Sequence, residues 1–238
     1  MKIVIKSCLL WFFILGGGLL FAQNTGHQQA IDSLAVGYLR IAGSQSVLYY
    51  GDEQEGHKRT TNHPYLNDDQ YAKARLSYLQ VIYPDALLRL DFSRDELVIM
   101  SPNRRNIVLF PENVDFAELH NQHIIYFRSD SLPGCPSTGY YLLLHSGKCK
   151  VLERRSATMM LKDNFSTSGE QYFSFNINYY LYKEGIYYNI RNKRGLLKIL
   201  SPYKKELKRF ISTNHLQFRH GAQAFLALTV NEYEKLSN

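Results

Sequence analysis

The stretch FSFNINYYLYKEGIYYNI, residues 173–190, carries the strongest local signal for the fold. Large apolar or aromatic residues stand at every second position of its first half, and Glu184 and Gly185 end this pattern. An alternation of period two is typical of a strand with one buried face, and two turn residues between such runs predict a tight β-hairpin. The turn sets the register. The predicted buried row is Phe173, Phe175, Ile177, Tyr179 and Leu181, with Tyr188 and Ile190 opposite its last two members.

The other face of this hairpin carries tyrosines and polar side chains, with Tyr180 opposite Asn189 and Tyr182 opposite Tyr187. Amphipathic rings beside amide and guanidinium donors suit a glycan or a protein partner, because they combine contact area with hydrogen bonds. The alternative is that the row packs beneath C-terminal helices. We name this row the tyrosine face; it comprises Asn178, Tyr180, Tyr182, Tyr187, Asn189 and Arg191.

A second hairpin is predicted at Ser146 and Gly147. Its register pairs Leu144 with Cys149 and Leu142 with Val151 as buried residues. This register turns Cys149 inward and His145 outward. Cys135 reaches Cys149 only if the segment 133–139, rich in proline and glycine, folds back. A disulfide between Cys135 and Cys149 therefore remains one possibility, and two free thiols the other.

Residues 71–192 contain short runs of Tyr, Phe, Leu, Ile and Val, separated by turn residues. Further turns at Ser93 and Arg94 and at Pro102 and Asn103 leave too few residues for a parallel crossover, which needs a dozen or more. The sequence therefore predicts an antiparallel sheet. A doubly wound α/β fold is disfavoured.

Helical periodicity is found on both sides of this region. His27 to Arg40 predicts an amphipathic helix, Ser46 to Tyr50 a short strand, and Gly51 to Asn67 an exposed polar loop. Near the C-terminus, Ser201 is a candidate N-cap with Pro202 at the first helical position, and a further helix follows.

The expected fold is α+β, mainly an antiparallel curved sheet or partly open barrel with one N-terminal and two C-terminal helices. The expected division of the chain is 1–22 (leader), 23–70 (N-terminal helix, strand and loop), 71–200 (β domain) and 201–238 (helical pair packed on the sheet).

The leader has the pattern of a secretory signal peptide. Lys2 and Lys6 frame its positive start, Cys8 to Phe21 is almost wholly apolar, and Ala22 precedes polar Gln23. The apolar run is shorter than the roughly 20 residues that a membrane span requires. We expect cleavage after Ala22 and an exported chain, periplasmic or outer-membrane-associated, with no transmembrane segment left. An uncleaved anchor is the alternative.

The positive charge is concentrated in one segment. The chain has 28 basic and 21 acidic residues, and between Arg191 and Arg209 eight basic residues stand against Glu206 alone. An exported protein rarely meets nucleic acid, so the predicted partner of this segment is anionic lipid or lipopolysaccharide. A merely solvated helix face is the alternative. We name the segment's eight cations the cationic plate: Arg191, Lys193, Arg194, Lys198, Lys204, Lys205, Lys208 and Arg209.

No strong catalytic, metal-binding or cofactor motif is present. On a strand, His120 and His123 point to opposite faces, which disfavours a metal pair. Asp91, Asp95 and Glu96 cluster at a turn, where carboxylates commonly bond the backbone. The polar loop from Asn62 to Asp69 could line a site, although a capped loop has the same composition. A hydrolase would need a cavity in which a histidine or carboxylate of this loop meets another titratable group.

Several short stretches together resemble an uncharacterised exported family of Gram-negative bacteria. They are FAQ (21–23), NHPY (62–65), RLDFSRDELV (89–98), GYYLLL (139–144) and KELKRFI (205–211). The resemblance covers nearly the whole exported chain. Members of such families are often associated with TonB-dependent uptake systems of the outer membrane, so the resemblance implies an accessory role in the cell envelope. It implies no functional residues.

The sequence thus predicts an exported, non-catalytic accessory or binding protein that engages an envelope protein or glycan through the tyrosine face. Two alternatives remain: peripheral docking to anionic envelope surfaces through the cationic plate, and a hydrolase with an unrecognised site. No cofactor and no metal are expected.

Overall fold

The computed structural model describes residues 33–34, 37–38, 46–57, 60–162 and 170–237. The predicted leader, residues 1–22, and most of the predicted helix from His27 to Arg40 lie outside the described residues. In the described part of the chain, no helix has the length and apolar character that crossing a membrane requires.

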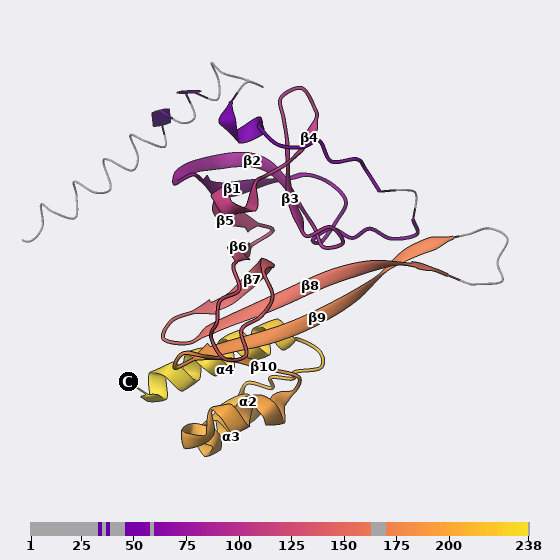
Figure 1. The fold of residues 1–238 in the computed structure, drawn as a ribbon. Coiled ribbons are helices and arrows are strands. Elements are labelled where there is room, and N and C mark those ends of the chain that lie inside the picture. Colours follow the sequence, from indigo (N-terminus) through magenta and orange to yellow (C-terminus); the bar gives the residue numbers. More distant parts are fainter. Residues whose placement is uncertain (1–32, 35–36, 39–45, 58–59, 163–169, 238) are drawn as a thin grey trace, which may run out of the picture.

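The described residues form one antiparallel sheet of ten strands, which confirms the predicted α+β class and the curved, open sheet (Figure 1). The strands are β1 (Ala72–Tyr78), β2 (Val81–Asp91), β3 (Glu96–Met100), β4 (Asn106–Val108), β5 (Val114–Leu119), β6 (Gln122–Phe127), β7 (Gly139–Ser146), β8 (Lys150–Leu161), β9 (Gln171–Lys183) and β10 (Ile186–Asn189).

Two meanders make up the sheet. β1 to β4 form the first and β5 to β10 the second. After β4 the chain passes through a 3-10 turn, Pro111–Asn113, and β5 then pairs with the free edge of β1. The spatial order is therefore β10-β9-β8-β7-β6-β5-β1-β2-β3-β4, with β10 and β4 at the two edges.

The turn between β2 and β3 folds back onto β8, so the first meander curls over the middle of the sheet. The backbone N–H of Ala157 donates to the carbonyl of Phe92 over 3.0 Å. Arg154 forms a forked ion pair with Asp95, at 2.5 Å and 2.8 Å, and Asp95 also accepts from the N–H of Tyr140. These contacts fix the curl, because they join strands that are not neighbours in the sheet.

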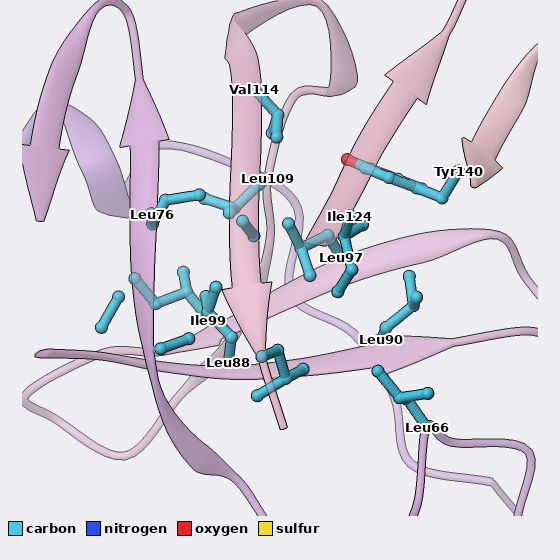
Figure 2. Packing of buried hydrophobic residues seen from close by; sticks show 14 of the residues in the cluster. Leu66, Leu76, Leu88, Leu90, Leu97, Ile99, Leu109, Val114, Ile124 and Tyr140 are labelled. Carbon is cyan, nitrogen blue, oxygen red and sulfur yellow. The ribbon is translucent and has the colours of Figure 1, made fainter. Parts of the chain in front are cut away.

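The first hydrophobic core fills the inside of this curl. Figure 2 shows side chains from β1, β2 and β3 meeting there, among them Leu76, Leu88 and Ile99, together with Val114 and Ile124 from the strands that follow. The five named side chains are all buried. Burying such aliphatic side chains is the main favourable free energy of the fold, at roughly 25 cal/mol per Å².

A second core lies between the sheet and three helices, α2 (Lys193–Ile199), α3 (Lys204–Thr213) and α4 (Ala222–Ser237). Leu181 and Ile190 from the sheet pack there with Leu207 of α3 and Phe225 of α4. Each of these side chains is fully or almost fully buried.

The prediction of two C-terminal helices was incomplete, because α2 precedes them. Asn192 caps α2 by accepting from the N–H of Gly195 at 2.9 Å. A glycine within a seven-residue helix weakens the sequence signal, and packing of the buried leucines of α2 overrides it. Ser201 and Pro202 belong to a 3-10 turn, Ser201–Tyr203, so Ser201 is not the predicted N-cap.

The predicted register of the β9–β10 hairpin is confirmed: Leu181 pairs with Tyr188, Tyr182 with Tyr187 and Tyr180 with Asn189. Glu184 and Gly185 both have positive φ, as a type I′ turn requires. The predicted buried row was wrong at two places.

Phe175 and Ile177 are 42% and 44% exposed, because this part of β9 runs between the two cores. Phe173 belongs to the first core and Leu181 to the second.

The predicted register of the β7–β8 hairpin was also wrong. His145 pairs with Val151 and Ser146 with Lys150, and a bulge lies between Leu143 and His145. The turn is therefore one residue longer than predicted. The Cys149 side chain is buried in the second core as expected, but His145 also faces the α4 side of the sheet, where its Nε2 lies 3.2 Å from Glu234.

Two local predictions before β1 need correction. Val47–Tyr49 is a 3-10 turn capped by the Ser46 hydroxyl, which accepts from the N–H of Leu48 at 3.3 Å, so no strand forms there. The described part of the segment from Gly51 to Asn67 is irregular as predicted. It is not wholly exposed, however, since Gln54, Tyr65 and Leu66 are buried.

Replacing Asp95 by alanine is expected to lower the free energy of unfolding by about 2 kcal/mol, because it leaves Arg154 without its carboxylate and Tyr140 N–H without its acceptor. The Arg154 and Asp95 side chains are only 17% and 29% exposed. Urea denaturation measures the effect.

The matched control is Asp85→Ala, which breaks an ion pair with Lys73 whose side chains are more than 70% exposed. We expect a loss below about 0.5 kcal/mol there. Equal losses in the two variants would show that the Arg154–Asp95 contact does not hold the curl.

Candidate functional site

The tyrosine face is brought together, but as a half-buried cluster and not as an open surface. The ring centroids of Tyr182 and Tyr187 are 4.9 Å apart, and Tyr187 meets Phe127 of β6 at 5.5 Å. Tyr180 meets Tyr141 of β7 at 6.2 Å. Sequence reasoning missed Phe127 and Tyr141, because their proximity depends on pairing between strands far apart in the chain.

The loop from Arg128 to Thr138 covers part of this cluster. The N–H of Tyr187 donates to the carbonyl of Pro133 over 2.9 Å, and the hydroxyl of Tyr141 donates to the carbonyl of Ser137 over 2.7 Å. Gly134 passes so close to the backbone of Tyr187 that a Cβ would lie 2.1 Å from its carbonyl oxygen. The C-terminal helices pack on the opposite side of β9 and β10, so they do not cover this face.

The polar members of the tyrosine face lie at its border: Asn178 is half-buried, and Asn189 and Arg191 are exposed. Burial raises the pKa of Tyr187 to about 12, with smaller contributions from Cys135 and Asp130. This phenol is thus neutral at physiological pH and offers a hydroxyl group and part of a ring.

The residues of the cationic plate lie on α2, on α3 and in the segment that joins β10 to α2. All eight of its side chains are exposed. Beneath them, Leu207 and Ile211 of α3 and Leu196 of α2 belong to the second core, so the amphipathic helices turn their cations outward. Within the described residues, no carboxylate lies within 4.0 Å of any plate cation, whereas Lys73 on β1 and Arg105 in the β3–β4 loop have such partners.

Cys135 and Cys149 are both free thiols in the structure. Cys149 is 3% exposed, and its N–H donates to Glu234 over 2.6 Å. Burial, and then the Glu234 carboxylate, raise the pKa of the Cys149 thiol to about 11. Cys135 is half-buried in the covering loop, where its sulfur accepts from the N–H of Asp130 at 3.3 Å.

Of the three carboxylates at the β2–β3 turn, Asp91 bonds the backbone of the turn as expected, whereas Asp95 accepts from the N–H of Tyr140 on β7 and Glu96 accepts from the Gln54 side chain. The Oδ1 atom of Asp91 accepts from the N–H and the hydroxyl of Ser93 at 2.8 Å and 2.9 Å. Its Oδ2 lies 2.6 Å from Nε2 of His57 and 3.2 Å from the amide of Gln54, which also bonds Glu96. His57 and Gln54 come from the irregular loop, and the sequence offered no signal for either.

This arrangement of Ser93, His57 and Asp91 differs from a nucleophilic relay. In a relay the carboxylate and the serine contact different nitrogens of the imidazole. Here the Ser93 hydroxyl lies 3.3 Å from the same Nε2 that faces Asp91. The geometry is that of a buried carboxylate saturated with hydrogen bonds.

The structure also places the histidine pair and the polar loop that the sequence analysis singled out. His123 lies 3.8 Å from Glu118 and stacks on Phe116 at 5.3 Å, while His120 is in the β5–β6 turn. Across the described residues, no group of three or more His, Cys, Asp or Glu side chains is placed to hold a metal ion. The loop from Asn62 to Asp69 does border a cavity, which also reaches His57 and Arg89.

No family model, no curated protein and no solved structure matches this chain. The resemblance to an exported Gram-negative family therefore stays a prediction.

The two thiols are expected to differ strongly in reactivity. In a Cys8→Ser variant at pH 8, a disulfide-exchange reagent should modify Cys135 at least about a hundredfold faster than Cys149, because a thiol of pKa about 11 is ionised in roughly one molecule in a thousand. Denaturant should then expose Cys149. Native and denatured protein that both lack reactive thiols would instead reveal a Cys135–Cys149 disulfide.

Proposed function

We propose that this protein is an exported binding protein that docks peripherally on an anionic lipid surface of the cell envelope through the cationic plate. The observation that carries the proposal is that all eight plate cations are exposed and that none has a carboxylate partner among the described residues. A surface cation without an ion-pair partner in the protein keeps its full electrostatic attraction for an external anion.

The expected affinity follows from the number of charges. A lysine or arginine close to an anionic membrane contributes about 1 kcal/mol, and the attraction decays within a Debye length of roughly 8 to 10 Å. Four plate cations lie on α3, namely Lys204, Lys205, Lys208 and Arg209. Their summed contribution is about 4 kcal/mol, which is roughly a thousandfold in the dissociation constant.

The docking is electrostatic because the apolar stripe of α3 is buried inside the protein. Leu207 and Ile211 are buried in the second core and are not free to enter a bilayer. Attachment through exposed cations alone is reversible and sensitive to salt. A protein attached in this way presents its curled sheet away from the surface, because Figure 1 shows α2 and α3 at one end of the molecule and β1 to β4 at the other.

The tyrosine face remains the proposed contact for a glycan or an envelope protein, as a second candidate. The observation in its favour is that exposed Asn189 and Arg191 lie beside rings that are only half-buried. Its accessible area is reduced by the covering loop, so we rank it below the cationic plate.

Sedimentation with vesicles of phosphatidylglycerol and phosphatidylcholine tests the docking. The protein should bind at low ionic strength and lose most of its affinity when salt is raised toward 0.5 M. The variant with Lys204→Gln, Lys205→Gln, Lys208→Gln and Arg209→Gln should bind roughly a thousandfold more weakly.

A control with the same loss of net charge carries Lys73→Gln, Arg75→Gln, Arg104→Gln and Lys162→Gln, all on the sheet and its loops. It should bind within about threefold of the unmodified protein. An affinity for the vesicles that does not change with salt, or equal weakening in both variants, would refute docking through the cationic plate.

A further inference from the structure

A cavity of about 510 Å³ opens beside β2, far from the cationic plate. Residues 56–57, 60–65 and 69, which precede β1, form one side of it, while β2 and β4 contribute Arg89 and Asn106. Its volume lies within the range of small-molecule sites, roughly 300 to 1,000 Å³. The side chains that line it are mainly polar, and they include His57, Thr60, His63, Asp69, Arg89 and Asn106.

Two aromatic rings hold the guanidinium of Arg89 in the lining of this cavity. Its guanidinium lies 3.9 Å from the ring centroid of Tyr65 and 4.4 Å from that of Tyr71. The ring of His63 lies nearly parallel to that of Tyr65, with an interplanar angle of 17°. Cation–π contacts of this kind fix the plane of a guanidinium without cancelling its charge.

The hydrogen bonds of Arg89 are incomplete. One Nη donates to the carbonyl of Asp69 at 3.0 Å, and the other lies 3.5 Å from the Gln54 side-chain oxygen. Nε is buried without a hydrogen-bond partner. A guanidinium has five N–H donors, so three of them have no acceptor among the described residues. A buried donor without an acceptor is costly. Because Nε is buried, the donors left for a ligand in the cavity are the two Nη N–H groups without an acceptor.

The neighbouring acids do not neutralise Arg89. In the described part of the chain, no carboxylate lies within 4.0 Å of it, in contrast to Arg154 and Arg105. The fully buried Asp91, two residues further along β2, is occupied by His57, Ser93 and Gln54. The side chain of Asp69 accepts from Gln70, and only its backbone carbonyl meets the guanidinium.

Tyr71 makes the arrangement rigid. Its hydroxyl donates to the side-chain oxygen of Asn106 over 2.8 Å, which ties the β1 side of the stack to β4. Burial raises the pKa of Tyr71 to about 12, although Arg89 acts in the opposite direction. The phenol therefore stays protonated, and the guanidinium remains the positively charged group of the stack.

We propose that this cavity binds a small carboxylate whose body carries hydroxyl groups, as in a sugar acid, and that Arg89 holds the carboxylate. A planar guanidinium with free N–H donors matches the two oxygens of a carboxylate. The hydroxyl, amide and imidazole groups of Thr60, Asn106 and His63 suit the hydroxyl groups of such a body. This site is independent of the cationic plate and needs no membrane.

Isothermal titration calorimetry with D-glucuronate as the probe tests the site, with D-glucose as the uncharged analogue and inorganic phosphate as a different anion. Glucuronate should bind one to one, and glucose at least about tenfold more weakly. Arg89→Gln should weaken glucuronate binding at least about tenfold. The matched control is Arg75→Gln, because Arg75 also stacks on a ring, that of Phe116 at 5.3 Å, but on the sheet surface. It should leave the affinity unchanged.

His63→Ala provides a second variant in case Arg89→Gln does not fold, because it leaves Arg89 between the tyrosine rings. It should weaken glucuronate binding about threefold or more. Equal binding of glucuronate and glucose refutes the proposal, as does binding of phosphate without binding of glucuronate. Unchanged affinity in the variants also refutes it. Because no vesicles are used, these outcomes are separate from the test of lipid docking.

Discussion

The long ladder of backbone pairs between β8 and β9 connects the two cores of the molecule. It joins twelve residue pairs, from Lys150 with Tyr182 to Leu161 with Gln171. One part of this ribbon packs in the first core and another part in the second. A single pair of strands therefore holds the curled sheet and the helices in one molecule, and the exposed Phe175 and Ile177 mark the stretch between the two cores.

This arrangement separates the exposed cations of the helices from the buried polar groups of the curled sheet. The helices on one side of the ribbon use their apolar faces internally and turn their cations to solvent. The curled sheet on the other side encloses buried polar groups, among them Asp91 and the guanidinium of Arg89, which is partly buried. A cation exposed to water suits a broad anionic surface, while a cation held between rings beside a cavity suits one small ligand. The two proposals therefore concern different ends of the molecule and different partners.

The irregular segment before β1 contributes more to the candidate ligand site than its composition suggests. Gln54 and His57 satisfy the buried Asp91, and Asn62 exchanges two hydrogen bonds with the backbone of Phe173 on β9. Gln54 and His57 are more than 30 positions from Asp91 in the chain, and Asn62 is 111 positions from Phe173. A polar loop can line a cavity without regular secondary structure, because side-chain bonds to distant strands hold its backbone in place.

Local sequence patterns were enough to predict the antiparallel class of the sheet, the β9–β10 register and the concentration of charge between Arg191 and Arg209, because period-two alternation, a two-residue turn and local composition are all properties of neighbouring residues. Three features became visible only in the folded molecule: which parts of each row are buried, the bulge before His145, and the contact of Arg89 with Tyr65 and Tyr71. Those outcomes depend on how far the sheet curls and on contacts between strands distant in the chain, which no local pattern encodes.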